Sequence, residues 1–338
     1  MAQMKYFYEL TISSSPHVHS PVTTQTIMRD VLIALAPALI GSVYFFGLRA
    51  LTVTLISVAA CVFFEWAYCK IMKKSCKVYD LSACVTGVLL AFVCPVTIPY
   101  WCIIIGAFFA IVVVKQLFGG LGRNFVNPAL AGRAFMFSWP ALMSTWVKVG
   151  WENQAGVVST VDAVTAATPL ASMHMNHTID PSAGSILDMF LGNVGGSLGE
   201  TSVLLLLIGL AYLLIRKIIK LYIPLSYIGT VAVLTFLFPL GNDNLTWMAA
   251  QLFSGGLMLG AIFMATDYVT SPITKLGQVV FGIGCGVLTV LIRYFGGYNE
   301  GVSYAILIMN CLVVLLDRIG RPTKFGAPKK VKKEAQKA

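Results

Sequence analysis

Charged residues are scarce in this sequence. Only 11% of its 338 residues are Asp, Glu, Lys or Arg, whereas 57% are hydrophobic and the mean hydropathy is +0.81. Ordinary soluble domains carry about 25% charged residues. The composition therefore excludes a soluble enzyme and a disordered binding segment, and it indicates an integral membrane protein.

Motifs for metals and nucleotides are also missing. The eight cysteines contain no CxxC pair, the spacing typical of zinc and iron–sulfur ligands, and none lies in residues 147–201. Walker loops, HExxH sequences and nucleophile elbows do not occur either. We expect no metal site and no complete catalytic site on this chain alone. A cluster shared with another subunit stays open, with Cys76 and Cys102 marked no better than the other cysteines.

Long apolar stretches dominate the chain instead. A helix needs about 20 predominantly apolar residues to cross a bilayer. Ten stretches predict an all-α integral membrane fold with about ten transmembrane helices, and they cover residues 31–48, 51–69, 81–98, 100–118, 128–146, 202–215, 221–240, 248–266, 276–294 and 302–316.

The basic residues orient these spans. Of the 24 Lys and Arg residues, all but Arg49, Lys148 and Arg293 fall on one predicted side of the membrane, which the positive-inside rule assigns to the cytoplasm. Both termini are then cytoplasmic. The net charge of +10 comes from basic residues that lie mainly on the cytoplasmic side of the membrane. We therefore expect the chain to contact a lipid bilayer and not to bind nucleic acid.

Five parts follow from this topology. A cytoplasmic N-terminal segment (1–30), expected not to be a cleaved signal peptide, precedes helices 1–5 (31–146). An acidic extracytoplasmic loop (147–201) precedes helices 6–10 (202–316), and a basic cytoplasmic tail (317–338) ends the chain. A connection as long as this loop usually has a function.

The two halves share a pattern. Residues 86–99 (TGVLLAFVCPVTIP) and 255–272 (GGLMLGAIFMATDYVTSP) both end in Val-Thr-x-Pro and lie half a chain apart. With five spans in each half, the second copy would be inverted in the membrane. The pattern predicts a 5+5 inverted repeat, an arrangement that brings broken helices together near the midplane.

One polar segment interrupts the apolar pattern. Residues 119–135 read GGLGRNFVNPALAGRAF, in which Asn127 suits a helix cap and Pro128 a first helical turn. Arg123 and Arg133 flank this helix start. They favour binding of an anion there, such as a phosphate, the polar edge of a flavin or a quinone head group.

Several motifs together resemble one family. They are SSPH (14–17), IMRDVLIALAP (27–37), the segment 119–135, DAVTAAT (162–168), GETS (199–202), ATDYVTSP (265–272) and YNEGVSYAILIMN (298–310). They resemble the RnfD subunit of the Rnf ion-translocating electron-transport complex along nearly the whole chain. The same motifs are found in the equivalent membrane subunit of the sodium-pumping NADH:quinone reductase, but that subunit carries a longer N-terminal extension.

The resemblance changes the interpretation of DAVTAAT. Taken alone, this segment would be a loop that leads into a short helix. In the family, a flavin transferase joins FMN through its phosphate to the last Thr of such a motif. The resemblance therefore implies a covalent FMN phosphoester on Thr168, with Asp162, Thr165, Ala166 and Ala167 completing the attachment motif. The flavin carries the redox chemistry, and the protein positions it.

Other site residues are expected on weaker grounds. Family members also hold noncovalent riboflavin, for which Asn124, Asn127 and Arg123 are candidates, with capping as the alternative for Asn127. Buried carboxylates suggest an ion path at Glu65 and Asp267. The alternatives are a helix-end turn at Asp267 and a pair between Glu65 and Lys70 or Lys73.

The resulting prediction is a flavoprotein subunit of a redox-driven ion pump in the cell membrane of a bacterium or archaeon. The resemblance implies a translocase complex that couples electron transfer between ferredoxin and NAD to Na⁺ or H⁺ transport, with the other subunits and a flavin transferase as partners. Two alternatives remain. One is a secondary transporter or channel with inverted repeats, and the other is the equivalent subunit of the quinone reductase.

Overall fold

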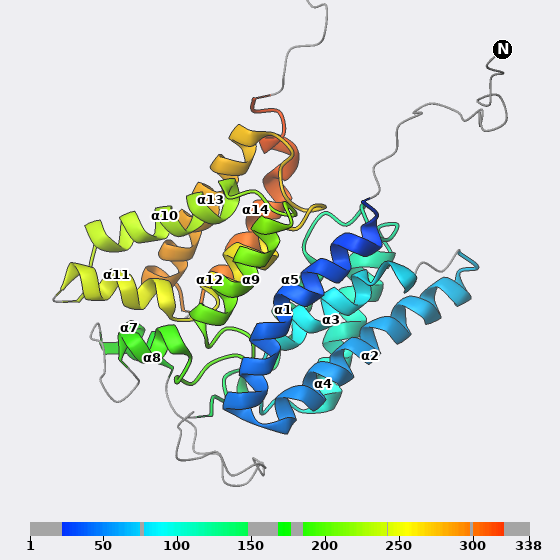
Figure 1. The fold of residues 1–338 in the computed structure, drawn as a ribbon, viewed down its shortest axis with the longest axis horizontal. Coiled ribbons are helices and arrows are strands. Elements are labelled where there is room, and N and C mark those ends of the chain that lie inside the picture. Colours follow the sequence, from blue (N-terminus) through cyan, green and yellow to red (C-terminus); the bar gives the residue numbers. More distant parts are fainter. Residues whose placement is uncertain are drawn as a thin grey trace, which may run out of the picture.

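Every regular element that the structure describes is helical (Figure 1). This computed structural model describes residues 22–74, 78–147, 168–176, 185–241, 243–297 and 300–320. The elements are α1 (Thr24–Phe46), α2 (Leu48–Ile71), η1 (Val78–Asp80), α3 (Ser82–Phe92), α4 (Tyr100–Phe108), η2 (Phe109–Gln116), α5 (Pro128–Met136), α6 (Pro140–Met143), α7 (Pro169–Asn176), α8 (Ile186–Leu191), α9 (Val203–Ile215), α10 (Tyr222–Leu237), α11 (Asn244–Phe253), α12 (Leu257–Leu259), η5 (Gly260–Met264), α13 (Lys275–Phe295) and α14 (Val302–Leu316).

Within the described residues, three helices are long and apolar enough to cross a membrane alone. They are α1, α2 and α13, with 23, 24 and 21 residues. The pair formed by α11 and the segment α12–η5 passes the same test together, but it is bent by 63°. Shorter apolar helices, α9, α10 and α14 among them, complete the bundle. The structure thus supports a multi-pass helical membrane protein.

Some predicted spans are interrupted. The prediction of one continuous helix over 81–98 is wrong, because α3 ends at Phe92 after 11 residues, or roughly 16 Å. Likewise, α5 ends at Met136 after nine residues. Prolines explain both ends, since Pro95 and Pro140 each disfavour helix in the residue before them. The predicted span 248–266 is divided in the same way by the bend after α11.

Helices at corresponding places in the two halves can be compared, although the inverted repeat itself stays a prediction. Both α3 and α12–η5 are short, and each precedes one of the Val-Thr-x-Pro sequences. Helix α1 packs on α9 and α5 on α14, so corresponding helices of the two halves meet. Figure 1 shows the N-terminal half, in blue and cyan, beside the yellow and orange C-terminal half.

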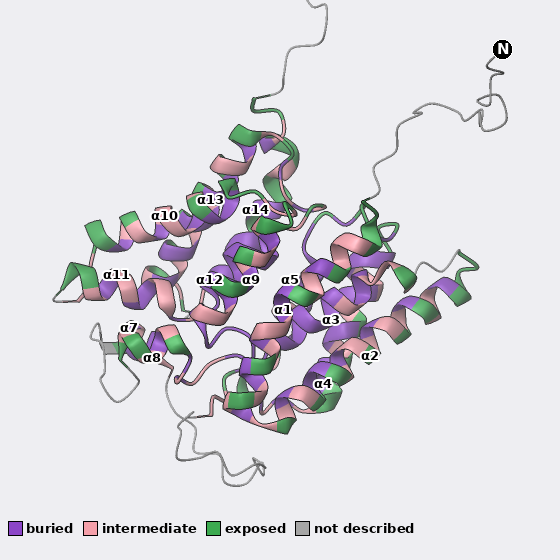
Figure 2. Cartoon of the chain, viewed as in Figure 1, coloured by how far each residue is buried: buried purple, intermediate pink, exposed green. Residues whose placement is uncertain are grey.

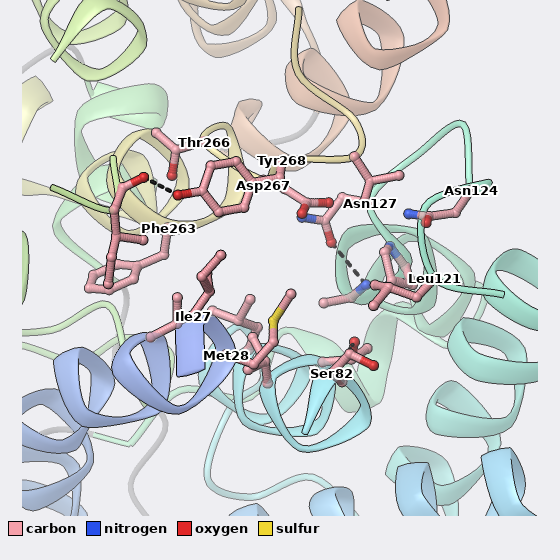
Figure 3. Close-up of a pocket in the computed structure, with 18 of the residues that line it drawn as sticks. Ile27, Met28, Ser82, Leu121, Asn124, Asn127, Phe263, Thr266, Asp267 and Tyr268 are labelled. Atoms are coloured by element: carbon pink, nitrogen blue, oxygen red, sulfur yellow. Dashed lines mark hydrogen bonds between the residues drawn. The ribbon is translucent and has the colours of Figure 1, made fainter. Parts of the chain in front are cut away.

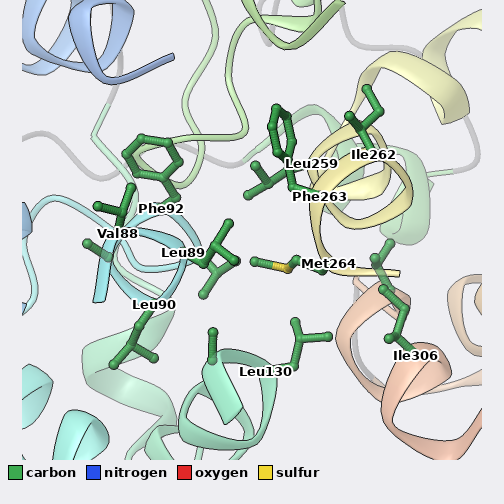
Figure 4. Packing of buried hydrophobic residues seen from close by; sticks show 14 of the residues in the cluster. Val88, Leu89, Leu90, Phe92, Leu130, Leu259, Ile262, Phe263, Met264 and Ile306 are labelled. Carbon is green, nitrogen blue, oxygen red and sulfur yellow. The ribbon is translucent and has the colours of Figure 1, made fainter. Parts of the chain in front are cut away.

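The apolar core lies where these short helices meet. Leu89 of α3, Leu130 of α5, Met264 of η5 and Ile306 of α14 are buried and lie close to one another there (Figure 4). Outer helices such as α2 and α10 alternate between buried and exposed residues (Figure 2). Their exposed side chains are largely apolar, which suits lipid or another membrane subunit.

Candidate functional site

Two cavities contain most of the predicted site residues that the structure describes. The first, here called the Asn127 cavity, has a volume of about 80 Å³ and lies between α1, α3, α9 and the segment after η5. It brings together Asn124, Asn127 and Asp267 from opposite halves of the chain (Figure 3). The side chain of Arg123 is exposed and does not line this cavity.

Asn127 caps a helix, as one of the two interpretations predicted. Its Oδ1 accepts hydrogen bonds from the backbone N–H groups of Ala129 (3.0 Å) and Leu130 (3.4 Å) at the start of α5. Its Nδ2 donates to the carbonyl of Met264, the last residue of η5, at 3.2 Å. One side chain therefore starts α5 and joins it to the end of η5.

Asn124 keeps a free acceptor in the same cavity. Its Nδ2 donates to the carbonyl of Val126 at 3.1 Å, but its buried Oδ1 has no hydrogen-bond partner among the described residues. A buried oxygen without a donor costs free energy. This atom is the one in the Asn127 cavity that a bound donor or cation would stabilise most directly.

Asp267 lies where the chain leaves η5. Its Oδ2 accepts a hydrogen bond from the Thr270 hydroxyl at 3.1 Å, and its backbone carbonyl accepts one from Ser271 N–H at 3.2 Å. These bonds form a turn after a helix, as the alternative interpretation predicted. The same residue lines the Asn127 cavity, so the turn also presents a carboxylate to it.

Glu65 forms a different ion pair from the one predicted. The Lys115 ammonium donates to Glu65 Oε2 at 3.0 Å and to the Ser82 hydroxyl at 2.8 Å, and Gln116 Nε2 donates to Glu65 Oε1 at 2.9 Å. The expected pairing with Lys70 or Lys73 is wrong. Glu65 lies on the buried face of α2, which packs against η2, whereas Lys70 is exposed over the Trp66 ring.

The second cavity, here called the Thr168 cavity, has a volume of about 310 Å³. Thr168 is partly buried and precedes α7, where its hydroxyl accepts a hydrogen bond from Ala171 N–H at 3.2 Å. The walls are mainly apolar and glycine-rich, and they include Phe137, Trp146, Phe253, Gly195 and Gly196. The remaining residues of the attachment motif, Asp162, Thr165, Ala166 and Ala167, lie outside the described residues.

A buried ion-pair network lines the same cavity. Arg133 of α5 pairs with Glu300, lies 3.5 Å from a carboxylate oxygen of Glu200, and donates to the Ser303 hydroxyl at 2.7 Å. Sequence reasoning noted Arg133 as an anion-binding candidate but missed both carboxylates. The available signal was that Glu200 and Glu300 lie inside two of the family motifs, GETS and YNEG.

The two carboxylates, which lie outside the predicted spans, are held in different protonation states. Burial, together with the nearby charge of Glu300, raises the pKa of Glu200 to about 8. Burial opposes ionisation of Glu300 as well, but the charge and hydrogen bond of Arg133 lower the pKa of Glu300 below its ordinary value. At neutral pH the network therefore approaches one cation paired with one anion.

Metal binding has no visible support in the described part of the chain, where no three His, Cys, Asp or Glu side chains form a group able to hold a metal ion. Cys102 is fully buried in α4, and Cys76 lies outside the described residues.

Comparison with known proteins identifies the same family as the motifs. The model of the NQR2, RnfD, RnfE family matches residues 11–326. The chain is 46% identical to the subunit designated D of the Na⁺-translocating ferredoxin:NAD⁺ oxidoreductase complex of Acetobacterium woodii, over 97% of this chain and 98% of that one. It is 43% identical to the proton-translocating counterpart of Clostridium ljungdahlii, over 94% and 96%. A third relative, the corresponding subunit of the ion-translocating oxidoreductase complex of Stutzerimonas stutzeri, is 39% identical over 89% and 91%.

Proposed function

Because the chain belongs to the NQR2, RnfD, RnfE family, we propose that it is the membrane subunit of a redox-driven ion pump and carries FMN on Thr168. The complex would couple electron transfer between ferredoxin and NAD to movement of Na⁺ or H⁺, as the names of its relatives describe. The other subunits of that complex are then its partners, and a flavin transferase attaches the FMN.

The observation that carries this proposal is the position of Thr168. Its hydroxyl lies at the N-terminus of the eight-residue helix α7 and at the wall of the Thr168 cavity. Helix N-termini favour phosphate because their N–H groups and dipole face it. A phosphoester on this hydroxyl would therefore place its negative charge where the backbone stabilises it.

The size and lining of the Thr168 cavity also suit the rest of the cofactor. Ligand sites typically measure about 300–1,000 Å³, are largely apolar and contain a few polar groups. The Thr168 cavity lies at the lower end of this range and combines aromatic walls with the guanidinium of Arg133. FMN supplies reversible electron transfer when bound, while this chain anchors its phosphate and excludes bulk water from its ring.

The Asn127 cavity fits a smaller group. Its volume of about 80 Å³ does not enclose a flavin ring system, so only the polar edge of riboflavin would reach the Asn124 oxygen. We propose instead that this cavity belongs to the ion path. Asp267 and Asn124 contribute oxygen atoms to this cavity. Such oxygens coordinate hard cations and accept hydrogen bonds from water. Glu65 joins this path through Lys115, which lines the same cavity.

The proposed topology keeps ten passes through the membrane, some of them made by pairs of short helices. Both termini lie in the cytoplasm, and Thr168 lies on the opposite side. The distribution of Lys and Arg supports this orientation. An FMN on that side would otherwise be lost by dissociation, and a covalent bond prevents this loss.

Three substitutions at Thr168 test the FMN proposal. The protein is produced together with its transferase, denatured, and examined by in-gel flavin fluorescence and intact mass. Thr168→Ser keeps both hydroxyl and helix cap and should retain covalent FMN. Thr168→Asn keeps only the cap and should lose it, as should Thr168→Ala. A colourless wild-type band would contradict the proposal.

The transporter alternative predicts a solute site and no bound chromophore, so the same gel separates it from the pump. The quinone reductase alternative keeps the flavin but ends the electron path at a quinone. Reduction assays of the purified complex with ferredoxin and with a quinone distinguish these two.

A further inference from the structure

Two short helices connect the cavities. Helix α5 begins at Pro128, next to its cap Asn127 in the Asn127 cavity, and its Arg133 lines the Thr168 cavity. The segment α12–η5 runs the other way: Gly255, just before it, lines the Thr168 cavity, and Asp267, just after it, lines the Asn127 cavity. Eight residues of helix measure roughly 12 Å, so one rigid element separates the two sites.

The two helices are joined to each other at both ends. At the Asn127 cavity, the Asn127 side chain donates to the carbonyl of Met264 at 3.2 Å. At the Thr168 cavity, Glu300 accepts a hydrogen bond from Gly256 N–H at 2.5 Å and pairs with Arg133 of α5. Polar contacts near each cavity therefore hold α5 and the segment α12–η5 together.

Between these contacts the interior is apolar. Leu130 of α5 and Met264 of η5 pack with Ile306 of α14, which contacts both helices (Figure 4). Apolar contacts have no preferred direction, so they permit small shifts along the helix axis. The 63° bend before α12 separates this segment from α11, so the segment can shift without α11.

At the Thr168 cavity, Glu300 has two partners that a new charge would affect. The Glu300 carboxylate stabilises the N-terminus of α12–η5 and also neutralises the buried Arg133. A new negative charge in the Thr168 cavity would compete with Glu300 for Arg133. The carboxylate would then be held less firmly, and with it the backbone of Gly256.

We propose that Glu300 is a positioning residue that transmits the charge state of the Thr168 cavity to the Asn127 cavity through α12–η5 and α5. This inference rests on the proposed function, since the charge is that of FMN and the response is ion movement at Asp267. The electron arrives from a reduced carrier on a partner subunit and leaves to an oxidised one. No covalent bond of this chain forms or breaks.

The test uses the complete complex in membrane vesicles and measures ions moved per electron transferred. Glu300→Gln removes the charge that pairs with Arg133, and Asn127→Ser keeps the helix cap but is too short to reach Met264. Each variant should keep the fluorescent FMN band, and its ions per electron are normalised to its own rate of electron transfer. Ions per electron should fall on the order of fivefold or more, within the usual range of coupling between sites.

Two comparisons make the result specific. The double variant Glu300→Gln, Asn127→Ser should be no worse than either single variant, because both break one connection. Asp30→Asn is the matched control: it removes another buried carboxylate paired with an arginine, Arg216, between α1 and α9. This control should leave ions per electron unchanged. Additive losses, or equal loss in the control, would overturn the inference.

A second measurement covers the case in which Glu300→Gln does not assemble. Hydrogen exchange of residues 256–267 in the wild-type complex should change when the FMN is chemically reduced, and it should not change in Thr168→Asn. An unchanged exchange rate in a wild-type complex that carries FMN would refute the coupling. A wild-type complex without FMN would instead refute the proposed function, so the fluorescent band distinguishes the two failures.

Discussion

Removal of the Lys115 ammonium should destabilise the protein strongly. Lys115 is 2% exposed, and its Nζ lies 3.0 Å from Glu65 Oε2 and 2.8 Å from the Ser82 hydroxyl. In Lys115→Met the methionine fills much of the same volume, so packing is largely kept. The Glu65 carboxylate then stays buried without its cation and retains one donor, Gln116.

The expected cost can be estimated from the pair itself. Breaking a buried ion pair by removing one partner typically costs about 3–5 kcal/mol, because the remaining charge is uncompensated. Replacing both charged groups removes that penalty. The double variant Lys115→Met, Glu65→Gln should therefore be much more stable than Lys115→Met alone and closer to the wild type.

Thermal unfolding of the detergent-solubilised complex measures this difference, with loss of the folded subunit followed by gel filtration. Lys70→Met is the matched control, because Lys70 is an exposed lysine near the end of α2, the helix that carries Glu65, and its Nζ lies 4.9 Å from the Trp66 ring centre. It should change stability by less than about 1 kcal/mol. The reasoning fails if Lys115→Met and Lys70→Met shift the transition equally, or if the double variant is the least stable.

Three further predictions concern packing, pH and the break after α11. Gly87→Ala should destabilise by about 1–3 kcal/mol in the same unfolding assay, because its Cβ would lie 2.7 Å from the backbone Cα of Val58 on α2. Since the pKa of Glu200 is raised to about 8, its protonation stabilises the fold fully below about pH 4.5, and this contribution is lost as pH rises through 8. In Glu200→Gln, thermal stability should fall less steeply with rising pH over that range than in the wild type. An unchanged pH dependence would show that another group causes the fall. Arg293→Gln should lower stability and increase protease cleavage near residue 254, because the guanidinium donates to the carbonyls of Gln251 (2.6 Å) and Ser254 (3.2 Å).

The length of the apolar stretches correctly predicted the helices that are continuous in the structure. The predicted span 302–316 has the bounds of α14, and 276–294 differs from α13 by one residue at each end. The family indicated by the motifs is confirmed by the match over residues 11–326. Hydropathy could not place the break in 81–98, because the residues after Phe92 are as apolar as those within α3. In 248–266 the break falls at Ser254, Gly255 and Gly256, a turn signal that apolar length alone does not detect.

Contacts between distant segments were beyond sequence reasoning. The prediction for Glu65 considered only lysines close along α2, but its buried face meets η2 and therefore Lys115. Arg133 and Glu300 lie 167 residues apart, and each alone resembles a polar residue in a short break between apolar stretches. Only the packing of α5 against α14 brings them together.

The broken helices explain why the polar residues gather where they do. A helix that ends inside a membrane protein leaves backbone N–H or C=O groups that lipid cannot satisfy. Here Asn127 satisfies the start of α5, Glu300 the start of α12–η5, and Arg293 the end of α11. Each of these side chains must be buried and polar, and each therefore creates a polar surface within an apolar core. Both cavities form beside such helix ends, so the requirement that stabilises a broken helix also supplies the polar groups that we propose for electron and ion transfer.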